Sequence, residues 1–399
     1  MRVLPAERHR DAAEVLGGAY LVGPVTDQMW ERSLPTYLGS LVQGILEEDG
    51  SVGGVARSFD VRLSISGGTV SAAAVSSVGV RADRRRRGYL RALMLEQLAT
   101  TRERGAVVAA LRATEASIYS RFGYGVASSY ATVTVSRRRA VMRAGAAAER
   151  GLRMLTPSAA VQELPAVFER IRGARPGTID RPAWWWASQT ARLIDRDQPM
   201  WTLCTVDDTG RIDGFLSYTT ADRDSWEDPH RAVITVLDLV AADEQVELTL
   251  WQAAFGIDLA ERIVAPKRPL DTTLPLALTD PRAAVITAVE DETWLRLLDV
   301  PAALAARSYA PGDPVVLGVT DELMPVNSGG YLVSRDGAER TDAPAELHCS
   351  VGDLAAGYLG GTRFSALAAA GRAQGSDDAL ARADRLFGTA QLPWCGTYY

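Results

Sequence analysis

A run of four arginines, Arg84 to Arg87, stands directly before Gly88 and the start of a predicted helix. The first backbone N–H groups of a helix have no partner within it, and the helix dipole makes that end positive. A glycine at this place lets the backbone approach a ligand closely, and the arginines add charge. The sequence therefore predicts a pyrophosphate site, although such a run is also typical of a solvated helix start.

A second segment, Ile118–Tyr124, carries two tyrosines, Tyr119 and Tyr124. A phenol with a pKa of about 10 is protonated at neutral pH and can give its proton to a leaving group. Tyrosine rings also commonly fill protein cores, which is the alternative interpretation of both residues.

Turn signals place the arginine run between a strand and a helix. The pairs Asp49-Gly50 and Gly67-Gly68 separate three β-rich runs, at about 41–48, 51–65 and 69–80. This pattern predicts an antiparallel meander. Four apolar residues then recur at helical spacing, namely Leu90, Leu93, Met94 and Leu98.

Three more elements complete the first unit. Residues 106–113 are predicted to form a buried strand, 115–122 a short helix that carries Tyr119, and 126–135 another strand. The unit ends near Ala140.

A second unit shows a similar order after an Ala/Arg-rich connector at about 137–152. The pair Asp213-Gly214 predicts a hairpin, residues 232–240 a strand, and Glu244 the start of a helix. Only AADEQ, residues 241–245, joins this strand to this helix. The second unit therefore lacks the phosphate-binding chemistry of the first.

The composition changes again at about Asp291, with three predicted strands, three short Ala/Leu-rich helical segments and the tail QLPWCGTYY. We therefore predict an α+β (mixed α/β) chain with three domains, at residues 1–140, 150–290 and 291–399.

The overall composition excludes several classes of protein. The chain has 399 residues, of which 47% are hydrophobic, and a formal net charge of −6, so disorder and a general nucleic-acid surface are disfavoured. Its three cysteines, Cys204, Cys349 and Cys395, lie far apart and predict neither a disulfide framework nor a metal site. No leader-like or membrane-spanning apolar segment is apparent, so we expect a cytoplasmic protein without a membrane partner.

The arginine segment resembles the R-x-x-G-x-G/A motif of the GNAT acetyltransferase superfamily, with Arg85 and Gly88 in register and Leu90 where Gly or Ala is usual. The tyrosine segment resembles the Y-x-x-F-G-F/Y segment of the same superfamily. Together with a tail that ends in an aromatic residue, these motifs resemble the Eis (enhanced intracellular survival) family over the whole chain. The resemblance implies an active GNAT domain, a second GNAT-like domain without the cofactor motif, and a sterol-carrier-like third domain.

The resemblance implies acetyl-CoA as the acetyl donor. The implied contacts to it come from three segments: Val78, Gly79 and Val80; Arg86, Arg87, Gly88, Tyr89, Leu90 and Arg91; and Thr114 and Glu115. The first segment would pair with the pantetheine arm as another strand would, and Gly79 is compatible with a break there.

Two catalytic residues are also implied by the resemblance. Tyr119 takes the position of the general acid that protonates the departing thiolate of coenzyme A. The C-terminal carboxylate of Tyr399 takes the position of the base, with the tail reaching the cleft of the first domain. Without that resemblance, a chain terminus is expected to be frayed and solvated.

The implied acceptors are amines, notably aminoglycosides and lysine side chains, and the implied assembly is a homohexamer built as a trimer of dimers. The family's penultimate acidic residue is replaced here by Tyr398, which removes a negative charge beside the acceptor. Asp27 and Trp30 are candidates for an acidic and aromatic acceptor pocket. The run Trp184–Trp186 is more typical of a core or an interface.

Three functions remain open from the sequence. The first is N-acetylation of small cationic amines such as aminoglycosides or polyamines. The second is acetylation of protein or peptide lysines. The third is a non-catalytic module, in which the last domain carries an acyl or lipid ligand and the first only senses acetyl-CoA.

Overall fold

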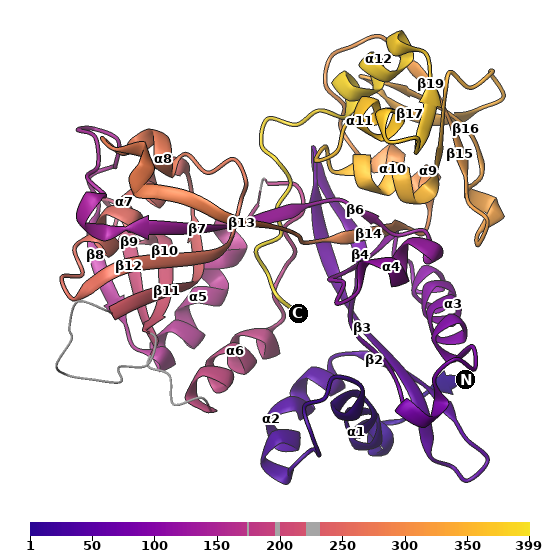
Figure 1. The fold of residues 1–399 in the computed structure, drawn as a ribbon, viewed down its shortest axis with the longest axis horizontal. Coiled ribbons are helices and arrows are strands. Elements are labelled where there is room, and N and C mark those ends of the chain that lie inside the picture. The colour runs from indigo at the N-terminus through magenta and orange to yellow at the C-terminus, as the bar shows by residue number, and fades with distance from the viewer. Residues whose placement is uncertain (174, 196–199, 221–231) are drawn as a thin grey trace.

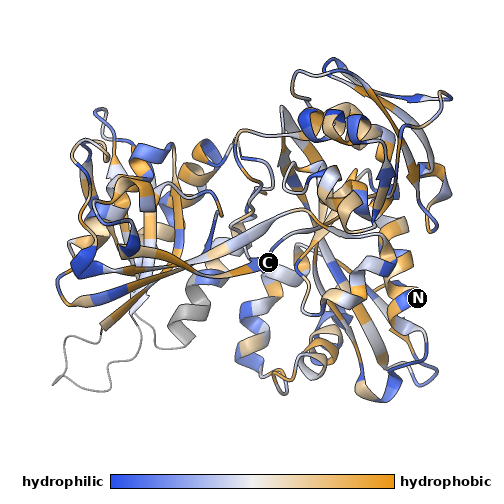
Figure 2. Cartoon of the chain, turned by 45° about the horizontal axis from the view of Figure 1, so that its top comes forward, coloured by the Kyte–Doolittle hydropathy of each residue, from blue (hydrophilic) through white to orange (hydrophobic). Residues whose placement is uncertain are grey.

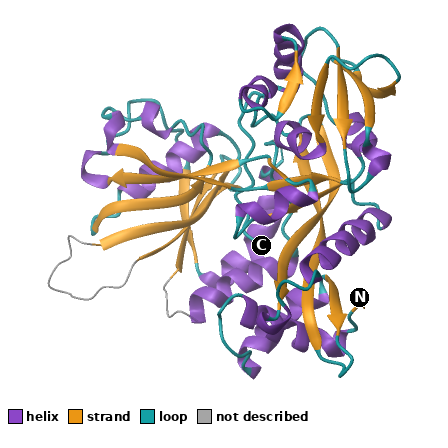
Figure 3. Ribbon diagram, turned by 45° about the vertical axis from the view of Figure 1, so that its right-hand side comes forward, coloured by secondary structure: helices purple, strands orange, loops and turns teal. Residues whose placement is uncertain are grey.

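The structure is a computed structural model that describes residues 1–173, 175–195, 200–220 and 232–399. Three sheets, each with its own helices, form three domains (Figure 1). Both helices and strands contribute to each domain (Figure 3). The mixed α/β class predicted from the sequence is confirmed.

Within the described residues, the first sheet has seven strands in the order β1-β2-β3-β4-β5-β14-β6. Their bounds are Arg2–Val3 (β1), Leu41–Leu46 (β2), Val52–Ile65 (β3), Gly68–Val80 (β4), Val108–Leu111 (β5), Trp294–Leu297 (β14) and Gly125–Val126 (β6). The helices of this part are α1 (His9–Ala19), α2 (Asp27–Leu38), α3 (Tyr89–Glu103) and α4 (Ala116–Tyr119). Strands β2, β3 and β4 form the predicted antiparallel meander, and β5 pairs parallel to β4.

The second sheet has the order β13-β7-β12-β11-β10-β9-β8 within the described ranges. Its strands are Ala284–Asp291 (β13), Ser129–Ser136 (β7), Ala260–Arg268 (β12), Ala232–Ala241 (β11), Ile212–Thr220 (β10), Met200–Val206 (β9) and Gly151–Leu155 (β8). Its helices are α5 (Pro157–Ile171), α6 (Ala183–Asp195), α7 (Glu244–Phe255) and α8 (Leu274–Ala277). The succession β10, β11, α7, β12 repeats the succession β3, β4, α3, β5 of the first sheet.

One predicted turn of the second sheet is wrong. The hairpin between β9 and β10 turns at residues 208–210, where the side chain of Asp207 accepts hydrogen bonds from the backbone of Thr209 and Arg211. Asp213 and Gly214 lie inside β10, and Gly214 leaves room for Val246 and Leu250 of α7. Its small size serves helix packing and not a turn.

The third domain has a five-stranded sheet, counted over the described chain, in the order β17-β16-β15-β18-β19. Its strands are Gly337–Thr341 (β17), Gly329–Ser334 (β16), Val315–Thr320 (β15), Leu347–Ser350 (β18) and Ala373–Gly375 (β19). Its helices are α9 (Val300–Ala306), α10 (Val351–Tyr358), α11 (Phe364–Ala369) and α12 (Asp377–Phe387). The three predicted helical segments are α10, α11 and α12.

Two strands lie in the sheet of the other domain. Strand β14 follows the second sheet in sequence but pairs between β5 and β6 of the first sheet. Strand β7 precedes the second domain and pairs between β12 and β13. The two sheets are thus tied by exchanged strands near the centre of the molecule (Figure 1).

The third domain is joined to the first sheet by a shared core. Phe59 and Leu63 of β3, Leu295 of β14 and Leu317 of β15 belong to one continuous buried cluster. The buried ion pair of Arg296 with Asp321 links β14 to the loop after β15, at 2.7 Å. Figure 2 shows apolar residues along many strands and polar residues in the outer turns. Among the described helices, none is both long and apolar enough to cross a bilayer.

Candidate functional site

The arginine segment forms a loop with left-handed backbone at two places. Gly88 is the residue before α3 and has φ 82°, and Arg86 has φ 62°, a conformation that is uncommon for a residue with a side chain. Backbone that alternates between left-handed and other conformations turns its N–H groups toward one concavity, which is an anion-binding arrangement. The loop therefore combines a concave backbone with the positive end of a helix.

The side chains around this loop divide into two sets. Those that face solvent and form no ion pair within the described chain are Arg85, Arg86, Arg87 and Arg91. By contrast, Arg84 and Tyr89 both contact the carboxylate of Glu47, at 3.0 and 2.8 Å. Glu47 therefore anchors the loop to the β2–β3 turn and leaves four guanidinium groups available for phosphates.

Tyr89 and Leu90 turn their side chains away from a ligand at this loop. The phenol of Tyr89 bonds to Glu47, and Leu90 packs against a buried cluster that contains Met94 and Leu98. This arrangement explains how leucine can stand where the superfamily motif usually has glycine or alanine.

Strand β4 separates from β5 just before the loop. The last parallel pair is Val75 with Leu111, and the pairing of β4 with β3 skips Ser76, which is a β-bulge. Beyond the bulge β4 continues to Val80 along β3 alone. Its outer side at Val78 is therefore an open strand edge, which is the kind of backbone that binds an extended chain.

Gly79 does not break the strand. It stays in β4, paired with Val55, and is fully covered by α1. A Cβ at this position would meet Ala19 and Leu16 at 2.9 Å each. The missing side chain lets α1 pack directly on the strand, and it brings Tyr20 at the end of α1 to Val78, where the two residues are hydrogen-bonded.

Tyr119 ends α4, and its side chain is 7% exposed. Burial raises the pKa of its phenol to about 12, with smaller contributions from the Tyr20 phenol and the Glu115 carboxylate. Its hydroxyl makes no hydrogen bond within the part of the chain that the structure describes. A neutral phenol without a protein partner can act as a proton donor.

Tyr124 contacts Tyr119 edge to face, with ring centroids 6.0 Å apart. It is 1% exposed, its hydroxyl is buried without a hydrogen-bond partner among the described residues, and burial raises the pKa of that phenol well above its usual range. The two tyrosines therefore differ in burial. The difference matters because a proton donor must reach the reacting atom. Of the two, Tyr119 is the less deeply buried.

Thr114 and Glu115 lie exposed between β5 and α4. Glu115 stands at the N-cap position of α4, but its side chain makes no capping hydrogen bond. A capping role therefore does not account for these two side chains.

The C-terminal tail runs between the two GNAT-like sheets (Figure 1). The carboxylate of Glu292, which is fully buried, accepts hydrogen bonds from the backbone N–H groups of Cys395 and Gly396 at 2.8 and 2.9 Å. It also accepts from Ser128 at 2.9 Å and pairs with Arg112 at 3.0 Å. Glu292 therefore joins the tail to both sheets, since it lies between β13 and β14.

Three further side chains hold the last residues. Arg112 donates to the carbonyl of Thr397, Arg181 to its hydroxyl, and the indole N–H of Trp185 to the carbonyl of Tyr398 at 2.6 Å. These contacts distinguish the last residues from a solvated chain end.

Arg181 is itself fixed by aromatic and acidic neighbours. Its guanidinium lies 3.9 Å from the ring centre of Phe168 and 4.2 Å from that of Trp185, and it pairs with Asp238 at 2.5 Å. Cation–π contacts and an ion pair together restrict its position. The tail is thus held by preorganised groups.

The last two residues have different surroundings. The ring of Tyr399 packs edge to face on Phe59, and its buried hydroxyl has no hydrogen-bond partner in the described part of the chain. The ring of Tyr398 lies beneath two cations, with Lys267 at 4.3 Å and Arg112 at 5.6 Å from its centre. Two positive charges therefore lie next to residue 398, where an acidic side chain would have supplied a negative one.

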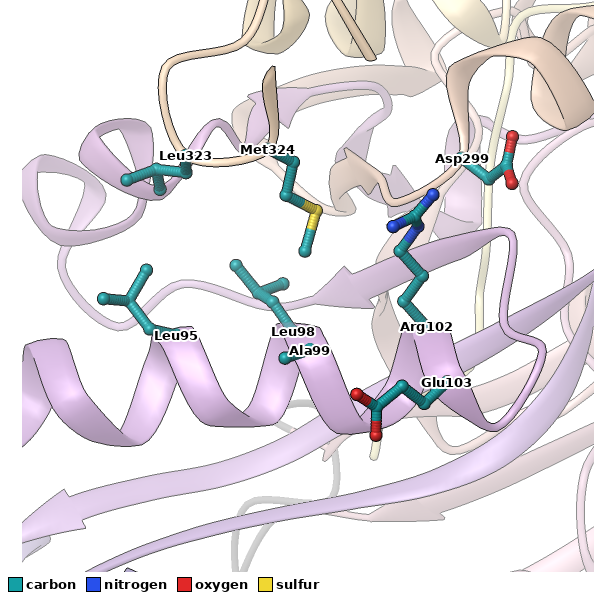
Figure 4. A pocket seen from close by; sticks show the side chains of 8 residues that line it. All are labelled: Leu95, Leu98, Ala99, Arg102, Glu103, Asp299, Leu323 and Met324. Carbon is teal, nitrogen blue, oxygen red and sulfur yellow. The ribbon is translucent and has the colours of Figure 1, made fainter. Parts of the chain in front are cut away.

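Two cavities in the described chain lie close to the tail and to α3, respectively. One of about 320 Å³ lies beside the tail and is lined in part by Trp185, Trp186, Asp238 and Tyr398. The other, of about 610 Å³, lies between α3 and the third domain, where Leu98, Arg102 and Met324 face one another (Figure 4). None of the predicted site residues lines the second cavity.

Asp27 and Trp30, which the sequence suggested for an acceptor pocket, line neither of these two cavities. Asp27 is exposed and pairs with Arg10 at 2.6 Å, and Trp30 packs on Tyr37 with ring centres 5.4 Å apart. No group of three His, Cys, Asp or Glu side chains in the described chain is arranged to hold a metal ion. All three cysteines are free and buried.

Sequence reasoning missed the residues that hold the tail and the strand edge, namely Tyr20, Arg112, Arg181, Trp185 and Glu292. The tryptophan run was a signal, but a run of apolar rings does not tell which ring carries a hydrogen bond. The others have no local pattern, because their partners lie far along the chain.

Comparisons with known proteins give consistent results. Models of acetyltransferase (GNAT) domains match residues 1–127 and 177–297, and a sterol carrier protein domain model matches residues 300–396. The chain is 37% identical to an uncharacterized N-acetyltransferase of Streptomyces coelicolor, over 88% of this chain and 87% of that protein. It is 35% identical to the N-acetyltransferase Eis of Mycobacterium tuberculosis, over 90% of this chain and 89% of that protein.

Solved structures agree with these relatives. The crystal structure of Eis1 from Mycobacterium abscessus superposes with a TM-score of 0.90 at 35% identity, covering 100% of this chain and 99% of the other. A GCN5-related N-acetyltransferase from Anabaena variabilis has the same fold, with a TM-score of 0.85 at 18% identity over 98% of each chain.

Proposed function

Because the chain belongs to the Eis family of GNAT N-acetyltransferases, we propose that its first domain transfers the acetyl group of acetyl-CoA to primary amines of small cationic acceptors, such as aminoglycosides or polyamines. The observation that carries this proposal is the left-handed loop of Arg86 and Gly88 at the start of α3, next to the open edge of β4. A helix N-terminus and a free strand edge together suit a pyrophosphate joined to an extended amide chain.

The residues of the first domain fit acetyl-CoA. Backbone N–H groups around Gly88 and the guanidinium groups of Arg86, Arg87 and Arg91 would hold the phosphates, and the edge at Val78–Val80 would hold the pantetheine arm. Thr114 and Glu115 would complete the contacts from the β5–α4 loop. When bound, acetyl-CoA supplies an acetyl thioester, whose carbonyl carbon the amine attacks.

Two groups of this chain would then move protons. The Tyr119 hydroxyl would donate its proton to the departing sulfur, and the carboxylate of Tyr399 would accept a proton from the amine. The base is needed because an amine with a pKa of about 10 is protonated at neutral pH and cannot attack. The hydrogen bonds that fix Cys395 to Tyr398 support a fixed position for the terminal carboxylate.

The second domain is not proposed to hold acetyl-CoA. Its strand β11 and helix α7 are joined at Asp243, which caps α7 by accepting from Val246. A carboxylate at the helix start repels a phosphate. We propose that this domain instead orders the tail through Arg181 and Trp185.

The assembly and the compartment are proposals as well. We propose a homohexamer built as a trimer of dimers, on the basis of the family alone, and action in the cytoplasm, where acetyl-CoA is available. Analytical ultracentrifugation tests the first, because a hexamer would sediment with six times the mass of 42.9 kDa.

The experiment that tests the function measures release of coenzyme A from acetyl-CoA in the presence of three amine classes: aminoglycosides, polyamines and lysine peptides. We expect coenzyme A to be released faster than in buffer alone with at least one aminoglycoside or polyamine. Turnover with lysine peptides alone would favour a protein acetyltransferase. No turnover with any class would favour a binding module.

A further inference from the structure

The hydroxyl of Tyr20 bonds to both backbone polar groups of Val78. It accepts a hydrogen bond from the Val78 N–H at 3.2 Å and donates one to the Val78 carbonyl at 3.4 Å. A single phenol thus takes the place of a neighbouring strand at this residue.

These two groups belong to the open edge of β4. Val78 lies two residues beyond the bulge at Ser76, after the pairing with β5 has ended at Val75. Among the described strands, none pairs with its N–H and carbonyl on that side, and both groups bond to Tyr20 instead. A polar backbone pair on a free edge is what an extended amide chain binds.

The position of Tyr20 follows from helix packing. Leu16 and Ala19 of α1 lie against Gly79, and Tyr20 is the next residue of the chain. Tyr20 is 43% exposed. The ring can therefore turn toward solvent without opening the buried core.

We propose that Tyr20 competes with the pantetheine arm of acetyl-CoA for Val78, so that its hydroxyl must leave β4 before the arm can pair there. This inference rests on the proposed use of acetyl-CoA. The competition lowers the affinity for the pantetheine part and leaves the affinity for the nucleotide part unchanged, because the arginine loop lies beyond the contact. Tyr20 acts through the backbone of Val78 and is therefore a positioning residue.

The test compares Tyr20→Phe with the unchanged protein by calorimetry, using two ligands. A neutral hydrogen bond contributes about 0.5–1.5 kcal/mol net, so we expect acetyl-CoA to bind roughly 2- to 10-fold more tightly to the variant. Adenosine 3′,5′-bisphosphate, which has no pantetheine arm, should bind both proteins equally. The KM for acetyl-CoA should fall by a similar factor.

Tyr218→Phe is the matched control, because Tyr218 is a half-buried tyrosine in the second sheet, stacked on Trp201. It should alter neither affinity. Equal or weaker binding of acetyl-CoA by Tyr20→Phe would overturn the inference, and so would an equal gain for adenosine 3′,5′-bisphosphate. Failure of the unchanged protein to bind acetyl-CoA would overturn the proposed function itself.

Discussion

The carboxylate of Glu292 accepts a hydrogen bond from the backbone N–H of Cys395 at 2.8 Å, across 103 residues of sequence. Its second oxygen binds Gly396 and Arg112. The link between the two GNAT-like sheets is therefore also the anchor of the tail. The position of the tail residues therefore depends on β13 of the second sheet and β14 of the first, because Glu292 lies between these two strands.

We expect Glu292→Gln to loosen the tail. The neutral amide leaves Arg112, which is mostly buried, without its counter-charge and offers weaker acceptors to Cys395 and Gly396. Breaking a buried pair typically costs about 3–5 kcal/mol of stability. Carboxypeptidase should release Tyr399 faster from this variant, and urea unfolding should show the lost stability.

The control for this change is Glu290→Gln, because Glu290 is exposed and its hydrogen bond within the described residues goes to Tyr130 and not to the tail. It should leave the release of Tyr399 unchanged. If carboxypeptidase released Tyr399 no faster from Glu292→Gln than from the unchanged protein, the other contacts of the tail would be sufficient to hold it.

Tyr119→Phe should lower kcat by about 10²-fold or more while acetyl-CoA binding stays nearly intact, which is the usual effect of losing a general acid. Tyr124→Phe should leave turnover close to normal and unfolding free energy unchanged or slightly higher, because it removes a buried hydroxyl without a partner. Steady-state kinetics and urea unfolding of both variants measure this. The opposite result, loss at Tyr124 and none at Tyr119, would identify Tyr124 as the acid.

The raised pKa of Tyr119 has a consequence at alkaline pH. Its phenol keeps its proton to about pH 12 in the folded protein, while an unfolded tyrosine loses it near pH 10. The folded state therefore binds more protons in that window, and the stabilising contribution, which is complete below pH 10, is lost as the pH rises toward 12. Urea unfolding at pH 9, 10 and 11 should show a smaller loss for Tyr119→Phe than for the unchanged protein. Equal losses would show that the phenol titrates normally.

Gly88→Val and Arg86→Glu should each weaken acetyl-CoA binding, by roughly tenfold or more together. Valine is disfavoured at the left-handed conformation of Gly88, and glutamate repels the phosphates. Gly145→Val is the control, since Gly145 has φ 74° in the connector, far from the loop in sequence, and a Cβ there meets no atom within 4 Å. Calorimetry in which all three variants bind alike would argue against this loop as the phosphate site.

The sequence predicted the elements that local patterns encode. The glycine turns delimited β2, β3 and β4, and helical spacing located α3, because residue preference and periodicity act over short distances. The Asp213-Gly214 hairpin was wrong because Gly214 is small for packing against α7, and a glycine alone does not distinguish the two uses. The exchange of β7 and β14 has no local signal, since strand pairing across domains is set by tertiary contacts.

The candidate site shows the same division. The arginine loop and Tyr119 were predictable because a motif carries them. The roles of Glu292, Arg181 and Tyr20 were not, since each depends on a partner between 58 and 216 residues away.

The most direct test of the account adds a single glycine after Tyr399, which moves the terminal carboxylate by one residue and replaces it by a peptide group. The same glycine added at the N-terminus is the control. We predict that the C-terminal extension lowers the rate of amine-dependent release of coenzyme A by at least about 10²-fold at unchanged acetyl-CoA affinity, while the N-terminal extension has no effect. A C-terminally extended protein that turns over as fast as the unextended one would contradict the proposed role of the Tyr399 carboxylate as the base.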